Sequence, residues 1–271
     1  MRKPLDRSRP IGMFDSGVGG LTVARAVIDL LPHEDLVYFG DLEHLPYGPR
    51  PSDEVKKFAL EIMDSLVDEG VKFLVVACNS AASAAMEEAR VRYDVPLISV
   101  IEPGVRAAIA ATRNRRIGMI GTVGTVSSGA YDRALASTRA NVRLFSKACP
   151  RFVEFVENGD TTSGEVIATA EEYLAELKKE DVDTLILGCT HYPLLKGVIQ
   201  YVMGERVVLV SSAEVTATEV FGRLHNENLL NPKEGAGLHR FISSSTDGVF
   251  GELGQRFLGP EFGEVEHRPW G

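Results

Sequence analysis

The sequence predicts an α/β protein of two pseudo-symmetric domains, each a mostly parallel sheet flanked by helices, with a cleft between them. Three observations lead to this prediction. Short apolar runs alternate with amphipathic stretches along most of the chain. Two different motifs that follow apolar runs each occur twice, in the same order. The chain has 271 residues, enough for one large domain or two modest ones.

Eight apolar runs are predicted to be β-strands. They are short, continuous and rich in Val, Ile and Leu, which is typical of strands buried on both faces of a parallel sheet. In chain order the predicted strands are residues 11–14, 36–39, 73–77, 97–100, 117–120, 142–145, 184–187 and 207–210.

The stretches between the strands have apolar residues at helical spacing. Ser52 can cap a helix whose apolar residues share one face, and Gly70 can end it. Thr162 and Glu165 fit a capping box at the start of another helix. After Val210 we expect one more helix and a tail rich in Gly and Pro. This last segment is expected to return to the first unit, because the second already has its strands.

An internal repeat relates the two halves of the chain. Residues 11–20 read IGMFDSGVGG and residues 117–126 read IGMIGTVGTV. Residues 74–80 read LVVACNS and residues 185–191 read LILGCTH. Because two motifs recur in the same order at nearly one offset, we infer two similar units related by a pseudo-dyad. The predicted division is a first domain of residues 1–100 plus 212–271 and a second domain of residues 101–211.

Cys78 and Cys189 occupy matching places in this repeat. Each directly follows an apolar run and precedes a predicted helix, and the second helix is expected to start at Pro193. Both thiols are therefore expected at carboxyl ends of strands, where open α/β sheets bind ligands. Nearby helix N-termini favour a thiolate and can lower the thiol pKa from its usual value of about 8.5. A lone cysteine here would be read as a small buried apolar side chain, but the repeat favours a functional pair.

Two thiols in one cleft allow three kinds of chemistry. One is a redox pair, although the chain has no Cys-x-x-Cys motif. Another is metal binding, although the six histidines are scattered and show no ligand spacing. The third is acid/base catalysis on opposite faces of one small substrate, such as inversion at the α-carbon of an amino acid. We favour the third, because groups of moderate pKa suit proton transfer near neutral pH.

Other candidate site residues lie near the predicted strand ends. Asp15 begins the run DSGVGG, whose glycines permit a tight turn and whose N–H groups can hold a carboxylate. This run matches neither a dinucleotide motif nor a P-loop, and a plain turn is the alternative. Tyr47, in a Pro-Tyr-Gly turn, is either a ligand contact or a core residue. His191 can hydrogen-bond a thiolate or a substrate, or be structural, whereas Cys149 has no repeat mate and is taken as structural.

The composition limits the functional classes. A net charge of -9 argues against a nucleic-acid-binding surface. No apolar run approaches the roughly 20 residues that span a membrane, and the basic start lacks the apolar stretch of a signal peptide. Three cysteines do not make a disulfide framework. We therefore expect a cytoplasmic protein with reduced thiols and a small-molecule substrate.

Several ordered motifs are specific enough to suggest a family. They are FDSGVGG at 14–20, PYG at 46–48, ACNS at 77–80, ACPRFVEFVE at 148–157 and LGCTHYPL at 187–194. Together they resemble the glutamate racemases, of the aspartate/glutamate racemase superfamily, over nearly the whole chain. The resemblance implies cofactor-independent interconversion of L- and D-glutamate, which supplies D-glutamate for peptidoglycan synthesis. It also implies a two-domain fold whose first domain is completed by the C-terminal part of the chain, and a homodimer.

The resemblance also assigns roles to single residues. Cys78 looks like the base that takes the proton from D-glutamate, and Cys189 like its counterpart for L-glutamate. Asp15 and His191 match residues that assist the thiols, and Glu157 matches a further acidic residue of the pocket. The substrate-binding residues that the resemblance implies are Asp15, Ser16, Tyr47, Gly48, Asn79, Ser80, Thr190 and His191.

Some positions depart from the family pattern or lie outside its motifs. Ser80 stands where the family usually has Thr, and it keeps the hydroxyl. Ala82 replaces a position that is often hydroxylated, and Glu154 stands where Pro is frequent. Thr122 and Thr125 lie in the repeat's glycine loop, and we expect them to line the second domain's side of the cleft.

Two other functions stay open at this point. The same fold can serve aspartate or a related acid, because one methylene gives only about 1–3 kcal/mol of discrimination. A non-catalytic sensor of acidic amino acids, or a protein-binding module, can also use this scaffold. Intact cysteines at both sites argue against the non-catalytic reading.

Overall fold

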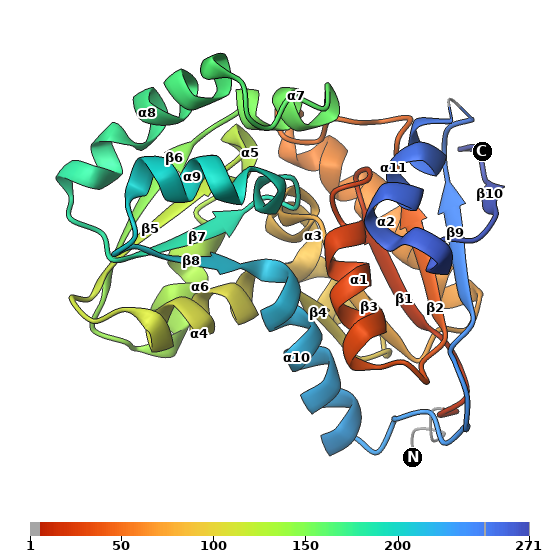
Figure 1. The fold of residues 1–271 in the computed structure, drawn as a ribbon. Helices are drawn as coiled ribbons and strands as arrows, with labels where there is room; N and C mark the ends of the chain where they lie inside the picture. The colour runs from red at the N-terminus through yellow and green to blue at the C-terminus, as the bar shows by residue number, and fades with distance from the viewer. Residues whose placement is uncertain (1–5, 247, 271) are drawn as a thin grey trace.

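The computed structural model describes residues 6–246 and 248–270 of the chain. Its strands form two sheets, and all the strand pairings in them are parallel. The first sheet has the order β10-β9-β2-β1-β3-β4, and the second has the order β6-β5-β7-β8. Figure 1 shows the two sheets side by side, with helices packed around each. The predicted class, parallel sheets flanked by helices, is confirmed.

The strands that were predicted from apolar runs are all present, with small differences at their ends. The first sheet contains β1 (Ile11–Asp15), β2 (Leu36–Gly40), β3 (Phe73–Val76), β4 (Leu97–Ser99), β9 (His239–Ser243) and β10 (Val265–His267). The second contains β5 (Arg116–Gly121), β6 (Arg143–Ala148), β7 (Thr184–Gly188) and β8 (Val208–Ser211). β9 and β10 were not predicted, because neither contains a long apolar run.

Helices connect consecutive strands and cover the sheets. In the first half of the chain they are α1 (Leu21–Leu30), α2 (Ser52–Asp68), α3 (Asn79–Arg92), α4 (Ile101–Ala111), α5 (Val123–Ser127) and α6 (Ala130–Thr138). In the second half they are α7 (Arg151–Glu157), α8 (Gly164–Lys179), η1 (Tyr192–Leu195), α9 (Lys196–Met203), α10 (Ser212–Asn226), α11 (Val249–Leu258) and η2 (Gly259–Glu261). Among the described residues, no helix is both long and apolar enough to cross a membrane.

The internal repeat corresponds to matching positions in the two sheets. β1 lies between β2 and β3, and β5 lies between β6 and β7. Cys78 follows β3 after one intervening residue, Ala77, and Cys189 directly follows β7. The matching strand orders β2-β1-β3-β4 and β6-β5-β7-β8 confirm the predicted pseudo-symmetry. Only the first sheet is extended further, by β9 and β10.

Three predicted helix starts are wrong by one residue. The helical segment after Cys189 begins at Tyr192, one residue before the expected Pro193. Ser52 is the first residue of α2, and Pro51 precedes it at the N-cap without a side-chain hydrogen bond. The cap of α8 is Ser163 instead of Thr162, and its hydroxyl accepts a hydrogen bond from the Val166 N–H. Ser163 is preferred because Asp160 accepts hydrogen bonds from both its N–H and its hydroxyl, which fixes it at the start of the helix.

The two halves share part of their core. A continuous apolar cluster joins residues beneath α2 and α3 to Ile117, Tyr131 and Ile186 of the second half. α10 then carries the chain from β8 back along α1 to the first sheet (Figure 1). The carboxyl ends of both sets of strands are thereby held against one another, with a pocket between them.

Candidate active site

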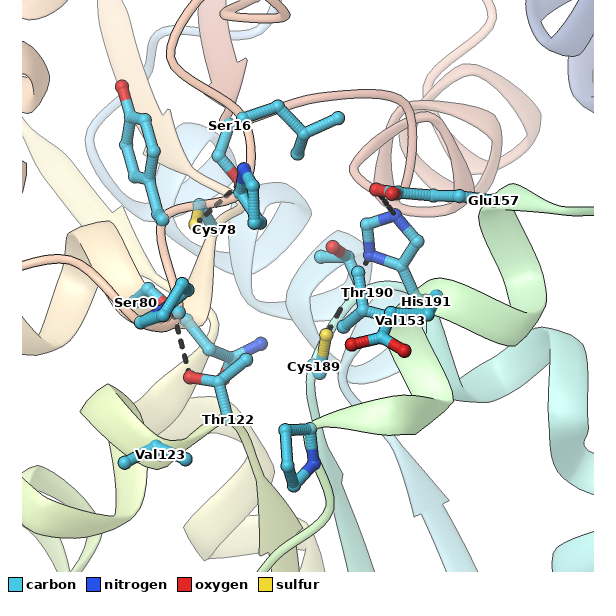
Figure 2. A pocket seen from close by; sticks show the side chains of 18 residues that line it. Ser16, Cys78, Ser80, Thr122, Val123, Val153, Glu157, Cys189, Thr190 and His191 are labelled. Atoms are coloured by element: carbon cyan, nitrogen blue, oxygen red, sulfur yellow. Dashed lines mark hydrogen bonds and ion pairs between the residues drawn. The ribbon is translucent and has the colours of Figure 1, made fainter.

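One pocket of about 160 Å³ lies between the carboxyl ends of the two sheets. Its walls come from the segments after β1, β2 and β3 on one side and after β5, β6 and β7 on the other. The lining residues are Ser16, Leu45, Pro46, Tyr47, Gly48, Pro49, Cys78, Asn79, Ser80, Thr122, Val123, Pro150, Val153, Glu154, Glu157, Cys189, Thr190 and His191. Figure 2 shows Cys78 and Cys189 on opposite sides of it.

Cys78 is the N-cap residue of α3, in an extended conformation that aims its side chain back at the first turn. Its Sγ accepts a hydrogen bond from the Ala81 N–H at 3.4 Å and lies 3.4 Å from the Ser16 hydroxyl. Burial, together with the nearby negative charge of Asp15, raises the pKa of the Cys78 thiol to about 12, although the hydrogen bonds act in the opposite direction. The expectation that the helix N-terminus lowers this pKa is therefore wrong for Cys78, because desolvation outweighs the helix N–H groups.

Cys189 has a different neighbour. Its Sγ lies 3.8 Å from Nδ1 of His191, and Nε2 of the same ring lies 3.3 Å from Oε1 of Glu157 (Figure 2). Nε2 and Oε1 are within ion-pair distance but are not aligned for a hydrogen bond, so Nε2 has no hydrogen-bond partner. Burial lowers the pKa of His191, but the Cys189 sulfur, Glu157 and Asp15 outweigh it and raise the pKa to about 10. A cationic ring in this place stabilises a thiolate beside it.

Asp15 lies behind the pocket wall and does not line the pocket. Its Oδ2 accepts hydrogen bonds from the N–H groups of Gly17 and Gly20, both at 3.1 Å, and its Oδ1 accepts one from the Thr190 hydroxyl at 3.3 Å. Burial raises the pKa of the Asp15 carboxyl, although the charge of His191 and these donors act in the opposite direction. Asp15 thus joins the glycine loop of one half to the Thr190 segment of the other.

Asn79 presents an unpaired donor near the pocket. Its Oδ1 accepts a hydrogen bond from the Tyr131 hydroxyl at 2.7 Å, which fixes the orientation of the amide. Its Nδ2 is buried and has no hydrogen-bond partner. A buried amide N–H without a partner costs free energy, so a ligand oxygen that accepts from it would be stabilised there.

Hydroxyl groups of both halves meet beside Asn79. The Ser80 and Thr122 hydroxyls are 3.1 Å apart, and the Ser80 and Thr125 hydroxyls are 3.4 Å apart. Thr122 lines the pocket, as expected, and Thr125 lies just outside the lining. Thr122 caps α5 by accepting a hydrogen bond from the Thr125 N–H.

Tyr47 both lines the pocket and belongs to the core. It is almost fully buried, and its hydroxyl donates to Oδ2 of Asp41 at 2.5 Å. Gly48 follows, and its carbonyl accepts a hydrogen bond from the Gly124 N–H at 3.0 Å. This backbone contact joins the two halves over the pocket.

Several lining residues were not predicted from the sequence. Pro150, Val153 and Glu154 come from the start of α7, where their spacing with Glu157 puts them on one helix face. The ACPRFVEFVE motif contains this spacing, which is the sequence signal for these residues. Leu45, Pro46, Pro49 and Val123 carried no chemical signal in the sequence. Cys149 is buried outside the lining, in agreement with a structural role.

Charged groups at the pocket are mostly acidic. The lining residues include Glu154 and Glu157 but neither Lys nor Arg. The described part of the chain also contains no group of three or more His, Cys, Asp or Glu side chains that is suited to hold a metal ion. Anionic groups of a ligand would therefore meet neutral amide, hydroxyl and backbone donors, and the ring of His191.

Comparisons with known proteins agree on one group of relatives. A model of the family described as Asp/Glu/Hydantoin racemase matches residues 21–220. A glutamate racemase of Parafrankia sp. is 54% identical over 261 residues, covering 96% of this chain and 94% of the relative. The crystal structure of a glutamate racemase isoform of Bacillus anthracis superimposes with a TM-score of 0.92 at 41% identity, covering 98% of each chain. That of Francisella tularensis glutamate racemase, in complex with D-glutamate, has a TM-score of 0.90 at 32% identity, covering 97% of this chain and 98% of the other.

Proposed function

Because the chain belongs to the Asp/Glu/Hydantoin racemase family, we propose that it is an amino-acid racemase that interconverts L- and D-glutamate without a cofactor. Relatives named glutamate racemase support the choice of substrate, since their identity of 53–54% extends over nearly the full chain. The observation that carries the proposal is the pair of thiols, Cys78 and Cys189, at equivalent strand ends on opposite sides of one small pocket.

The proposed mechanism uses the two thiols as acid and base. Cys189, beside the cationic His191, is the thiolate that takes the α-proton of L-glutamate. The C–H electron pair stays on the substrate as a carbanion, which the adjacent carboxylate stabilises. Cys78, whose raised pKa keeps it protonated at neutral pH, then donates its proton to the opposite face and gives D-glutamate.

The reverse reaction needs no additional group. After one turnover Cys189 carries the proton and Cys78 is the thiolate. This is the form that takes a proton from D-glutamate, so the same two residues exchange roles. Asp15 and His191 are proposed to assist Cys78 and Cys189 respectively. The negative charge of Asp15 lies near enough to Cys78 to contribute to its raised pKa, and Nδ1 of His191 lies 3.8 Å from the Cys189 sulfur.

Substrate binding is proposed to use neutral donors. The unpaired Nδ2 of Asn79 is suited to donate to a substrate carboxylate, with the hydroxyls of Ser80, Thr122 and Thr190 nearby. Ser16 and the Tyr47–Gly48 backbone complete the first side of the pocket. Glu157 is proposed to hold His191 in its charged form, because it lies within ion-pair distance of the ring.

The biological setting forms a further part of the proposal. D-glutamate would supply peptidoglycan synthesis, and the chain would work in the cytoplasm as a homodimer. We also propose that the domains follow the two sheets, with residues 1–100 and 212–271 forming one and residues 101–211 the other. Strands β1–β4, β9 and β10 all belong to the first sheet, which supports this division.

The test replaces each thiol separately and follows the optical rotation of glutamate. We expect C78A and C189A to lose at least about a thousandfold in racemisation rate, because each lacks the acid or the base for one face. C149A is the matched control, since Cys149 is a buried thiol outside the pocket lining, and it should retain racemisation. Full activity of either C78A or C189A would contradict the mechanism.

A second measurement distinguishes catalysis from binding alone. The unsubstituted protein is incubated with glutamate or with aspartate in deuterated water, and α-proton exchange is followed by NMR. We expect rapid exchange with glutamate and much slower exchange with aspartate. Binding of glutamate without exchange would favour a sensor, and faster exchange with aspartate would change the substrate.

A further inference from the structure

One wall of the pocket is a loop without regular secondary structure. Leu45, Pro46, Tyr47, Gly48 and Pro49 are five consecutive lining residues in the connection between β2 and α2. No strand or helix hydrogen bonds fix this connection, so its shape depends on turns, on side-chain contacts and on the backbone hydrogen bond from Gly124 to Gly48. Whatever holds the loop therefore sets the width of the pocket on that side.

The loop is tied to a buried carboxylate at the end of β2. Asp41 is fully buried, and its Oδ2 accepts from the Tyr47 hydroxyl at 2.5 Å and lies 3.1 Å from Nδ1 of His44. Its Oδ1 accepts from the Ser244 hydroxyl at 2.8 Å and from the indole N–H of Trp270 at 2.8 Å. We call Asp41, His44, Tyr47, Ser244 and Trp270 the Asp41 cluster. Only part of it belongs to the loop, because Ser244 and Trp270 come from far along the chain.

Trp270 is held in place independently of the pocket. Its ring lies 4.7 Å from that of His44, edge to face, and 5.5 Å from that of Phe58. The segment before it is fixed because β10 pairs with β9. The N–H of Arg268 also donates to the Ser243 carbonyl, and its guanidinium donates to the Ser65 hydroxyl. The indole is therefore a fixed donor, against which Asp41 and the loop are aligned.

We propose that Trp270 is a positioning residue for the pocket, acting through Asp41 and Tyr47 on the wall formed by residues 45–49. This inference rests on the proposed racemisation of glutamate. A buried carboxylate needs all its donors, so the loss of the indole N–H lets Asp41 and the Tyr47 hydroxyl rearrange. The thiols would be little affected, because Cys78 is held by α3 and Cys189 follows β7.

The test compares steady-state kinetics of W270F with those of the unsubstituted protein. W270F keeps an aromatic ring but lacks the donor, and we expect KM for glutamate to rise about three- to tenfold in both directions, with kcat within about twofold. S244A removes another donor to Asp41 and should act in the same direction. It also serves as the second variant if W270F does not fold.

Trp270 also provides its own spectroscopic readout, as the single tryptophan of the chain. Its fluorescence is expected to change saturably as D-glutamate is added, with a midpoint near KM.

Y93F is the matched control for the kinetic comparison, because it removes an aromatic hydroxyl that donates to Leu60 and Asp64, away from the pocket lining. This variant should lower the thermal midpoint and leave KM unchanged.

The outcomes separate this inference from the function on which it rests. Racemisation by the unsubstituted protein is measured first, and its absence counts against the proposed function. If that protein is active while W270F and S244A both keep KM within about twofold, Trp270 has only a structural role. Unchanged Trp270 emission at saturating D-glutamate would likewise overturn the positioning role.

Discussion

Asp15 is a buried carboxylate at the point where the two halves of the molecule meet. Burial raises the pKa of Asp15, so its ionised form at neutral pH is less favourable in the folded chain than in the unfolded chain. The cost is present at pH values above the raised pKa and disappears as the carboxyl becomes protonated. A group that reduces stability in this way is typical of functional sites.

We predict that D15N is more stable but less active. The amide can still accept from the Gly17 and Gly20 N–H groups and can donate to Thr190, so the contacts persist without the buried charge. The thermal midpoint at pH 7 should rise by roughly 2 °C or more, and kcat should fall at least about tenfold. Calorimetry and racemisation assays measure the two effects.

The control for this substitution is D29N. Asp29 is an exposed carboxylate paired with Arg25 on α1, and its replacement should not raise the thermal midpoint. A lower midpoint for D15N than for the unsubstituted protein would show that the Asp15 charge contributes more through its hydrogen bonds than it loses by burial.

At the scale of elements, the contact of the β2–α2 loop with α5 depends on two glycines. Gly124 donates its N–H to the Gly48 carbonyl, and a Cβ on Gly124 would lie 2.9 Å from that oxygen. A Cβ atom and a carbonyl oxygen do not pack this closely, and the Gly48 oxygen cannot turn away as a side chain could, because it belongs to the backbone. The loop must therefore move away from α5 if residue 124 has a side chain.

We predict that G124A weakens substrate binding through this displacement. KM for glutamate should rise about threefold or more, because Gly48 and its neighbours form one wall of the pocket. G222A is the matched control, since Gly222 lies within α10 with no atom within 4 Å of an added Cβ. It should leave KM unchanged and stabilise α10 by about 0.5–1 kcal/mol. Equal KM values for the two variants would show that the loop adapts.

The elements differed in how far the sequence could predict them. The strands of the sheet centres were predictable, because burial on both faces requires continuous apolar runs such as that of β3. β9 was not, because its pairing with β2 joins residues about two hundred positions apart, and this long-range contact leaves little local pattern. Helix starts depended on single contacts, such as that of Asp160 with Ser163.

The candidate site was predictable where it coincides with the repeat or with a family motif. Strand-end positions brought Cys78, Cys189 and His191 to one pocket, because parallel strands end at the same edge. The sequence did not predict the high pKa of Cys78, because desolvation depends on atoms packed around the sulfur from distant segments. The Asp41 cluster was also missed, since Ser244 and Trp270 meet Asp41 only in the folded chain.

At the scale of the whole molecule, the pseudo-dyad applies to the strands but not to the charges. Cys78 has a negative neighbour, Asp15, and Cys189 has a positive one, His191. The two sulfurs are therefore equivalent in position and different in electrostatic environment. Because of this difference, the free energy of unfolding of the whole molecule depends on pH.

We predict that the free energy of unfolding decreases between about pH 6.5 and 9 because of His191. Its pKa is raised to about 10 in the folded chain from an ordinary value of 6.5. The stabilisation is thus complete below pH 6.5 and is lost as the pH rises towards 10. Above pH 9 the raised pKa of Cys78 also decreases the free energy of unfolding as the pH rises. Unfolding is therefore measured below pH 9.

Urea unfolding of H191N and of the unsubstituted protein across this range measures the effect. H191N should show a smaller decrease in stability with pH. H225N is the control, because His225 is an exposed residue of α10, and it should follow the unsubstituted protein. An identical slope for H191N would mean that His191 is neutral in the folded protein.

The order of strands along the chain has a consequence for synthesis on the ribosome. β5 to β8 are contiguous, so the whole second sheet is translated before α10 and before β9 and β10 of the first sheet. β2 is translated early, but its neighbour β9 is translated only after more than half of the remaining chain has followed. Until then its edge is open to other nascent chains, a situation in which unpaired strands aggregate. The segment with the weakest sequence signal is therefore the one that closes the first sheet, and slow translation ahead of it would prolong the vulnerable interval.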